Sequence, residues 1–305
     1  MSERSAGSRD PASERQRMRL HTHHSLPALP ALAAVVAGVL VAPIVLVARP
    51  ADRAGTPQGA QAPAQDARVW LGRAAEIEAY LRTAEVVKLE DLSVGVTKPK
   101  KATLAPGGPV QFFAWKAIRP GMYNGYRESY QFEVAAYELD KLLGLDMVPP
   151  TVARAHRNER GAAIMWVSPT KSFGDLGGAP SPPASMTDMW ARQIVKAKMF
   201  DNLINNLDPN LGNWLVDPAW NLILIDHTRS FRSGRRMVHE MTRVDENLWN
   251  RMKALTEPGL LEALGEWLSD GDIRSVIQRR DRMQELIDEL VAERGEAYVF
   301  MRGGA

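Results

Sequence analysis

The sequence predicts an α+β domain of two lobes, in which a strand-rich half comes before a helical half. Up to about residue 167, short segments rich in β-branched and aromatic residues alternate with turn residues, which is typical of strands. After about residue 186, apolar residues recur every three or four positions, which is typical of helices. We therefore expect one domain at 67–305, with an N-lobe at about 67–167, a C-lobe at about 186–305 and a cleft between them.

The strand-rich half contains two predicted helices among several extended segments. The first helix spans 70–82, and a Pro-Gly-Gly-Pro turn at 106–109 separates two of the strands. The second helix spans 131–143 and ends at Gly144, a residue that commonly terminates helices. Strands or extended segments are expected at 91–97, 101–104, 110–118, 148–152 and 162–167.

The helical half follows a Gly-, Pro- and Ser-rich loop at 171–185. Its first helix starts near residue 190, and its apolar stripe predicts that the helix runs directly into Asp208. A small hairpin is expected next, with strands at 214–216 and 222–225. Three further helices are predicted at 246–255, 260–268 and 273–293.

The chain in front of this domain divides into three segments. Residues 1–25 are polar and lack a hydrophobic period, which predicts a disordered tail. Residues 26–48 predict a transmembrane or signal segment, because 26–47 is a run of 22 residues without a charge, enough for a helix of about 33 Å. A cleaved signal peptide usually has a shorter apolar core, so an anchor is favoured and a signal peptide is the alternative. Residues 49–66 are rich in Ala, Gln, Pro and Gly and predict a flexible tether.

The charges around the apolar segment indicate an orientation. Arginines are slightly more frequent before the segment than after it: Arg15, Arg17 and Arg19 precede it, and Arg49 and Arg53 follow it. The positive-inside rule therefore favours, by three arginines to two, a domain outside the cytoplasm. We expect a protein that is anchored to a membrane through 26–48, or exported, with its domain on the extracytoplasmic side.

Composition excludes several classes of site. The absence of cysteine excludes disulfides, zinc–thiolate sites, iron–sulfur clusters and cysteine nucleophiles. The formal net charge is only +2, and no run of Lys and Arg with interleaved aromatics is present, so nucleic acid is not an expected partner.

Three polar residues in the helical half form a set with a chemical meaning. Asp208 follows an apolar helix, Asn213 lies five residues later, and Asp226 follows an apolar strand-like run. Phosphoryl transfer requires a group that accepts a proton from the attacking hydroxyl and oxygen ligands that hold metal-bound phosphates. The order and spacing of the three residues are those of a kinase catalytic loop and metal-binding acid. The alternative, an Asp-Pro turn with Asp226 in a second turn, remains open on this segment alone.

A lysine in the strand-rich half supports the same chemistry. Lys116 lies within the apolar stretch 112–118, and a buried ammonium group requires an anionic partner. Glu133 is well placed on the helix at 131–143 to be that partner, and Glu128 and Glu138 are its rivals. A lysine on an edge strand that reaches solvent is the alternative.

Two further features have a less specific meaning. The loop 93–98 contains Gly95 and could cover phosphates through its backbone. Four arginines follow the second acid and suggest either an anionic acceptor or a solvated loop: Arg229, Arg232, Arg235 and Arg236.

Three segments together resemble a known family. The sequence at 132–152, FEVAAYELDKLLGLDMVPPTV, resembles the αC helix and the following segment of the atypical secreted kinases, the family of the Golgi casein kinase and the xylose kinase. Segments 200–208 and 224–231 resemble the catalytic loop and metal-binding motif of that family. HipA-type and phosphoinositide kinases are more distant relatives. The resemblance covers about 86–231 and implies a two-lobed protein-kinase-like fold.

The resemblance also implies roles for individual residues. It makes Asp208 the catalytic acid, and Asn213 and Asp226 the ligands of Mg²⁺ or Mn²⁺. It makes Lys116 the residue that contacts ATP and Glu133 its partner. The implied activity is transfer of phosphate from ATP to a hydroxyl group of a protein Ser/Thr or a sugar.

The chain departs from the family pattern at two places. Pro209-Asn210 stands where relatives usually have Arg-His, and His227-Thr228 stands where others have Asn-Gly or Phe-Gly. Neither departure removes a metal ligand. They leave open the alternative of a catalytically inactive scaffold that binds nucleotide at the membrane.

Overall fold

The computed structural model describes residues 66–92 and 99–303, which belong to one compact unit. No helix in these two ranges is both long and apolar enough to cross a bilayer. The predicted tail at 1–25 and the transmembrane or signal segment at 26–48 lie outside the described residues, as does the tether except for its last residue.

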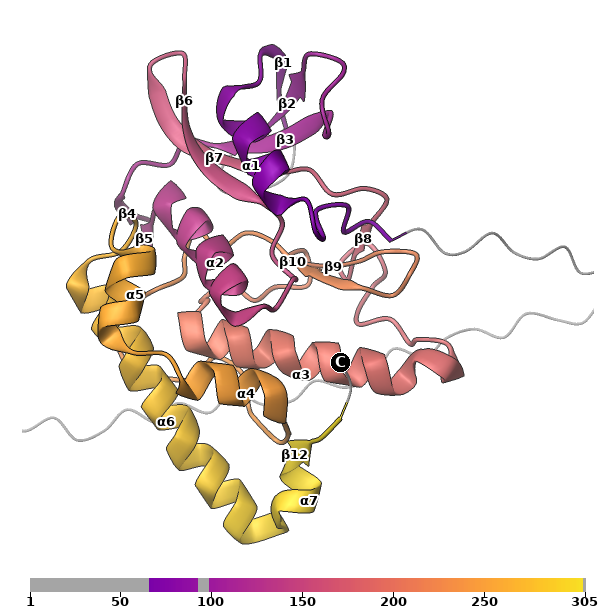
Figure 1. Cartoon of the computed structure of the whole chain (residues 1–305), viewed down its shortest axis with the longest axis vertical. Coiled ribbons are helices and arrows are strands. Elements are labelled where there is room, and N and C mark those ends of the chain that lie inside the picture. Colours follow the sequence, from indigo (N-terminus) through magenta and orange to yellow (C-terminus); the bar gives the residue numbers. More distant parts are fainter. Residues whose placement is uncertain (1–65, 93–98, 304–305) are drawn as a thin grey trace, which may run out of the picture. The chain divides into compact units, whose positions relative to one another are not determined.

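An antiparallel sheet of five strands forms the N-lobe (Figure 1). Its strand order is β1-β2-β3-β7-β6, with β1 at Val86–Asp91, β2 at Lys100–Leu104, β3 at Phe112–Lys116, β7 at Glu159–Met165 and β6 at Thr151–His156. Helix α1 (Ala74–Thr83) buries Ile77 and Leu81 with Phe113 and Trp115 of β3. Of the strand predicted at 91–97 the structure describes only 91 and 92, and Asp91 is the last residue of β1, which starts earlier than predicted, at Val86.

Helix α2 (Tyr130–Leu143) packs against β6 and β7 on one side and against helices of the C-lobe on the other. Its start is set by Ser129, whose side chain accepts a hydrogen bond from the backbone N–H of Gln131 at 3.0 Å. Its end is set by Gly144, which adopts a left-handed conformation with φ of 53°. Both ends therefore agree with the sequence prediction to within one residue.

A hairpin that the sequence analysis missed joins β3 to α2. It consists of β4 (Gly121–Tyr123) and β5 (Tyr126–Glu128), which pair only with each other. Asn124 and Gly125 between them both have positive φ angles, 50° and 83°, as a tight two-residue turn requires. The Asn-Gly pair was a usable signal, because this dipeptide favours such turns.

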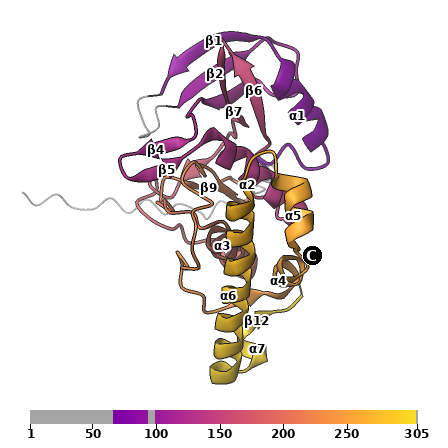
Figure 2. The ribbon, with the colours of Figure 1, turned by 90° about the vertical axis from the view of Figure 1, so that its left-hand side faces the viewer.

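Helices dominate the C-lobe, and Figure 2 shows the longest, α6, running along its length. They are the 3₁₀ turn η1 at Ala184–Met186, α3 at Thr187–Ile204, α4 at Glu246–Lys253, α5 at Glu257–Leu264, α6 at Asp270–Arg294 and α7 at Glu296–Val299. Their core surrounds α3, where Phe200 and Leu203 are fully buried, and includes Ile273 and Val276 of α6. The predicted helix at 260–268 is shifted, because Thr256 caps α5 and starts it earlier.

Small sheets complete this lobe. One has the order β10-β9-β8, with β10 at Leu222–Leu224, β9 at Trp214–Val216 and β8 at Lys171–Ser172, and β9 and β10 confirm the predicted hairpin. The other is a parallel pair of β11 (Val244–Asp245) and β12 (Phe300–Met301). The predicted loop at 171–185 thus contains a short strand.

The prediction that a helix runs directly into Asp208 was wrong. Helix α3 ends at Ile204, because Asn205 adopts a left-handed conformation with φ of 50° and its N–H bonds back to the carbonyl of Asn202. The apolar side chain of Leu207 continued the helical period without belonging to the helix. Asp208 therefore lies in a loop, where its side chain is directed by neighbouring polar groups.

Candidate functional site

A cavity of about 720 Å³ lies between the sheet of the N-lobe and the segments around β9 and β10. Four of the six residues singled out in the sequence line it: Lys116, Asp208, Asn213 and Asp226. Glu133 is buried next to the cavity and bonds Lys116. Gly95 lies outside the described residues. Residues from both lobes thus meet at one cavity.

The alternation of side chains along β3 directs Lys116 toward α2. Phe113 and Trp115 pack toward α1, so Ala114 and Lys116 face the other side of the sheet. There Lys116 Nζ donates a hydrogen bond of 2.7 Å to Glu133 Oε1 and lies 2.7 Å from Asp226 Oδ1. The side chains of Lys116 and Glu133 are only 6% and 3% exposed.

The two carboxylates keep this buried lysine charged. Burial alone would lower the pKa of Lys116, but the charges of Asp226 and Glu133 outweigh it and raise the pKa above its ordinary value. Burial alone would likewise raise the pKa of Glu133, but Lys116 and the hydrogen bond from His227 hold that pKa well below its ordinary value. The site therefore contains an ammonium group held between two carboxylates.

Glu128 and Glu138, the rivals of Glu133, have other partners. Glu128 pairs with Arg229 at 2.8 Å, and Glu138 pairs with Lys141 at 3.0 Å. Glu133 is held by more than the lysine, since Glu133 Oε2 accepts a hydrogen bond of 3.0 Å from the backbone N–H of His227. The same carboxylate therefore connects β3, α2 and the segment that follows β10.

Asp226 follows β10 in a left-handed conformation with φ of 62°. Asp226 Oδ1 accepts a 2.6 Å hydrogen bond from the hydroxyl of Thr228, in addition to its contact with Lys116. Asp226 Oδ2 has no hydrogen-bond partner within 66–92 and 99–303. The side chain is 29% exposed, so this second oxygen is available to a ligand in the cavity.

Asn213 and Asp208 are fixed to each other. Asn213 Nδ2 donates a hydrogen bond of 2.9 Å to the backbone carbonyl of Asp208, which leaves the amide oxygen of Asn213 as an acceptor. Asp208 Oδ1 accepts from Asn210 Nδ2 at 2.8 Å, and Asp208 Oδ2 accepts from Arg229 Nη1 at 3.1 Å. The loop thus holds the carboxylate of Asp208 at the edge of the cavity, with its side chain 34% exposed.

The donor set suits a hard divalent cation that is shared with an anionic ligand. The amide oxygen of Asn213 and Oδ2 of Asp226 are oxygen donors, which Mg²⁺ and Mn²⁺ prefer. Within the described ranges there is no group of three or more His, Cys, Asp or Glu that could hold a metal by itself. Such a pair of oxygens fits a metal whose remaining ligands are phosphates and waters.

Apolar side chains form the remaining walls of the cavity. The N-lobe contributes residues of β3, β7 and the segment after β7, and the C-lobe contributes one residue of β9 and the residue after β10: Ala114, Ile164, Met165, Val167, Leu215 and Ile225. A slot with apolar walls and charged groups at one end fits a planar heteroaromatic ring that carries phosphates.

The four arginines after Asp226 do not form one patch. The side chain of Arg229 is 13% exposed and lines the cavity. Arg232, Arg235 and Arg236 are exposed, and Arg235 pairs with Glu285 of α6 at 2.5 Å. The fold therefore separates four arginines that are close in the sequence, and it places Arg229 in contact with Asp208, which was not predicted.

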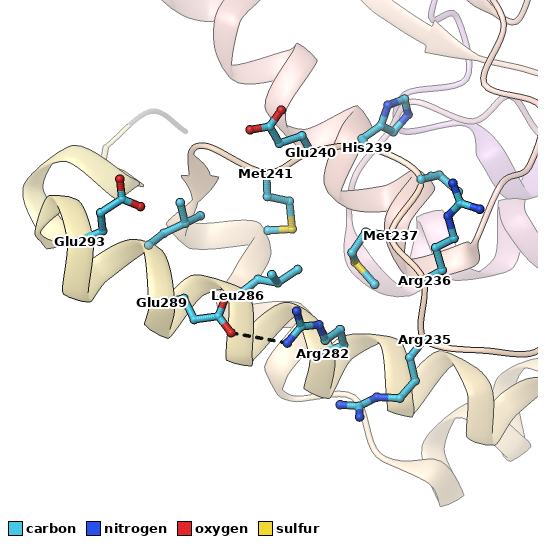
Figure 3. A pocket seen from close by; sticks show the side chains of 12 residues that line it. Arg235, Arg236, Met237, His239, Glu240, Met241, Arg282, Leu286, Glu289 and Glu293 are labelled. Atoms are coloured by element: carbon cyan, nitrogen blue, oxygen red, sulfur yellow. Dashed lines mark ion pairs between the residues drawn. The ribbon is translucent and has the colours of Figure 1, made fainter.

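A second hollow of about 510 Å³ lies between residues 235–241 and α6 (Figure 3). Arg235 and Arg236 lie toward one end of it and Glu293 toward the other, and Arg282 and Glu289 form an ion pair of 3.6 Å. None of the six predicted site residues lines this hollow, so it is separate from the candidate site.

Neither a protein-family model nor a curated protein matches the chain. A crystal structure of the Golgi casein kinase with Mn/ADP bound is similar, with a TM-score of 0.55 at 14% identity over 75% of this chain and 78% of that chain. The structure of hydra Fam20 with sugar is similar too, with a TM-score of 0.59 at 16% identity over 76% of this chain and 93% of that chain. The predicted two-lobed kinase-like fold is therefore confirmed.

Proposed function

We propose that this protein is a phosphotransferase that uses ATP and a divalent metal ion to phosphorylate a hydroxyl group. One observation carries the proposal. Lys116, Asp208, Asn213 and Asp226 line a single cavity, and Lys116 is held there by Glu133 at 2.7 Å. A cation, a proton acceptor and two oxygen ligands are the groups that phosphoryl transfer requires.

Lys116 supplies a positive charge to the phosphates of ATP. Its partner Glu133 holds it in position, and because Lys116 has three N–H groups, one of them can turn to a phosphate oxygen while the bond to Glu133 persists. The contact with Asp226 is the one that ligand binding would release, since the carboxylate of Asp226 is the more exposed of the two.

Asn213 and Asp226 hold the metal ion. The crystal structure of the Golgi casein kinase contained Mn/ADP, which supports Mn²⁺ or Mg²⁺ and an adenine nucleotide as the ligands here. The ion, when bound, neutralises charge that develops on the phosphates. The residues themselves contribute two oxygens at fixed positions, one from an amide that is anchored to the backbone of Asp208.

Asp208 orients the acceptor and takes its proton. Its carboxylate lies at the cavity edge, and each of its oxygens already accepts one hydrogen bond, so each retains a lone pair for a hydroxyl group. The departure at Pro209-Asn210 is compatible with this role, because Asn210 fixes the carboxylate through its amide. A hydroxyl of a protein Ser/Thr or of a sugar is the proposed acceptor, and the hydra Fam20 structure, which contained a sugar, supports the second class.

The competing proposal is a nucleotide-binding scaffold without turnover. It is supported by the fact that both oxygens of Asp208 are engaged, one of them by the cation of Arg229. The departure from the family pattern at His227 gives the scaffold no further support. The His227 contact is made by its backbone N–H, which bonds Glu133, and the metal ligands remain in place.

We also propose that the domain is tethered to a membrane on its extracytoplasmic side. The uncharged stretch 26–47 and the excess of arginines before it support this arrangement. Reporter proteins fused to each end of the full chain test it. A C-terminal reporter that is active only in the cytoplasm would contradict it.

Nucleotide binding and turnover test the main proposal. The full chain is expected to bind ADP only in the presence of Mg²⁺ or Mn²⁺. Asp226→Ala is expected to lose this metal-dependent binding. Asp208→Ala is expected to retain binding and lose transfer. Glu133→Gln, which removes the carboxylate charge that holds Lys116, is expected to weaken ADP binding. Glu138→Gln is its matched control, because Glu138 lies on the same helix but pairs with Lys141 outside the cavity. Metal-dependent binding without turnover in wild type, unchanged in Asp208→Ala, would favour the scaffold.

A further inference from the structure

Two cationic side chains line the cavity, Lys116 and Arg229, within the part of the chain that the structure describes. Lys116 is buried at the inner end with Glu133. The loop from Asp208 to Asn213 has the sequence DPNLGN and supplies no Lys or Arg. Among the described residues, the positive charge beside Asp208 therefore comes from Arg229, which follows Asp226 by three positions.

Contacts on three sides hold the guanidinium of Arg229 in one orientation. Arg229 Nε and Nη2 both lie 2.8 Å from Glu128 Oε1, and Nη1 donates to Asp208 Oδ2 at 3.1 Å. The ring of Tyr126 lies against its flat face, with the guanidinium carbon 4.3 Å from the ring centroid. Glu128 is itself only 5% exposed.

The guanidinium retains donors for another ligand. A guanidinium has five N–H groups, and three of them are directed at the two carboxylates. The other two have no partner within 66–92 and 99–303. In the proposed function Asp208 takes the proton of the acceptor hydroxyl while that hydroxyl oxygen attacks the γ-phosphorus. A guanidinium 3.1 Å from the carboxylate of Asp208 is therefore next to the phosphoryl group in transfer.

We propose that Arg229 is a catalytic residue that neutralises the transferring phosphoryl group; this inference rests on the proposed function. The bond between the acceptor oxygen and the γ-phosphorus forms, and the bond from that phosphorus to the β–γ bridging oxygen breaks. The electron pair of the broken bond leaves with ADP, and the acceptor proton goes to Asp208. Arg229 exchanges no proton and donates hydrogen bonds to the equatorial oxygens, where negative charge is spread.

The electrostatics of Arg229 agree with this role. Burial would lower its pKa, but the hydrogen bond and charge of Glu128, together with Asp208 and Asp226, outweigh that effect and raise the pKa. Arg229 therefore stays charged. Glu128 is a positioning residue in this proposal, because it holds Arg229 from the N-lobe side and touches no reacting atom.

A comparison of ADP with ADP plus aluminium fluoride tests the proposal, since the fluoride complex mimics the phosphoryl group in transfer. Calorimetry of the full chain with Mn²⁺ is the measurement. Wild type is expected to bind the mimic more tightly than ADP. Arg229→Gln is expected to bind ADP within about threefold of wild type and to lose the extra affinity for the mimic, because only the mimic meets the guanidinium. Its rate of ATP hydrolysis is expected to fall by about 10³-fold or more.

Arg127→Gln is the matched control. Arg127 lies on β5 between Tyr126 and Glu128, the two hairpin residues that contact Arg229. Its own side chain pairs with Asp272 of α6 at 2.5 Å and does not line the cavity. It is expected to bind both ligands as wild type does. Arg229→Lys is the second variant, which keeps a charge but not the flat, forked donor, and it is expected to recover only part of the affinity for the mimic.

The outcomes distinguish an Arg229 that acts on the transferring phosphoryl group from one that does not. If Arg229→Gln retains the extra affinity for the mimic, or loses ADP and mimic equally, Arg229 does not act on the transferring group. If Arg229→Gln fails to fold, Arg229→Lys decides, and full wild-type affinity for the mimic in that variant would overturn the proposal. Absence of ADP binding by wild type would instead overturn the proposed function, which distinguishes the two failures.

Discussion

Replacement of Lys116 by Met tests the central ion pair of the site. Met retains most of the apolar stem of the lysine but removes the charge that Glu133 and Asp226 share. The carboxylate of Glu133, which is 3% exposed, is then left with the N–H of His227 and a longer contact of 3.4 Å from the hydroxyl of Thr228. The variant is therefore expected to be much less stable than wild type near neutral pH.

The size of the stability loss depends on how deeply each of the two carboxylates is buried. Asp226 is 29% exposed and can be solvated again, so Glu133 accounts for most of the cost. Removal of one member of a buried ion pair costs about 3–5 kcal/mol of unfolding free energy. In a domain of this size that corresponds to a fall in Tm of about 6–20 °C. Urea unfolding followed by tryptophan fluorescence measures the free energy directly.

The stability difference between wild type and Lys116→Met is expected to depend on pH in one direction. In wild type the pKa of Glu133 is below its unfolded value of 4.5, so the pair stabilises the fold above that pH and loses this effect as pH falls through the folded pKa. In Lys116→Met the cation is gone, and burial raises the pKa of Glu133 instead. Protonation then favours the folded variant, so the deficit is expected to narrow as the pH falls from about 7 to about 5.

Lys141→Met is the matched control, since Lys141 also contacts two carboxylates, Glu78 at 2.9 Å and Glu138 at 3.0 Å, but is 35% exposed. It is expected to cost about 1 kcal/mol or less. The double variant Lys116→Met/Glu133→Gln is expected to recover more than half of the single variant's loss, because it removes the unpaired charge. A deficit for Lys116→Met no larger than that of the control, or one that does not change with pH, would refute the reasoning.

Three further predictions concern the frame around the site. Gly161→Ala is expected to lower stability by about 1–3 kcal/mol in thermal unfolding, because a Cβ there would lie 2.5 Å from the carbonyl oxygen of Lys116; an unchanged Tm would contradict this. Arg279→Met is expected to cost about 3 kcal/mol or more in urea unfolding, since the buried guanidinium bonds three backbone carbonyls that would lose their donor. Asp245→Ala removes the N-cap of α4, worth about 1–2 kcal/mol, and also the 2.7 Å ion pair with Arg192, so its loss is expected to exceed that of the cap alone, whereas Asp245→Asn retains the capping oxygen and should lose less; equal losses would argue against the cap.

Local sequence rules were sufficient to predict the structure where a single residue imposes a strong physical requirement. A lysine inside an apolar strand must find an anion, and a helix that ends at a glycine has few other places to end. The pairing of Lys116 and the end of α2 at Gly144 were predictable for these reasons.

Local rules failed where the requirement was weak or spread over distant residues. The end of α3 depends on a left-handed Asn205, and neither Gly nor Pro marks it. Strand β1 is largely exposed, so its residues show no apolar alternation that a pattern search could find. The β4–β5 hairpin is too short to produce a hydrophobic period, although its Asn-Gly turn was visible.

The order of the polar and charged groups of the site was a property of the sequence itself. Lys116, Glu133, Asp208, Asn213 and Asp226 could be read as a set because phosphoryl transfer requires these chemical types in a recognisable succession.

Only the tertiary structure decided which charge meets which. Lys116 pairs with Glu133, 17 positions away. Glu128 pairs instead with Arg229, 101 positions away, and this pairing places a cation beside Asp208. Hydrogen bonds act over about 3 Å. A spacing along the chain does not specify a distance of that size until the sheet, the hairpin and the catalytic loop have packed together.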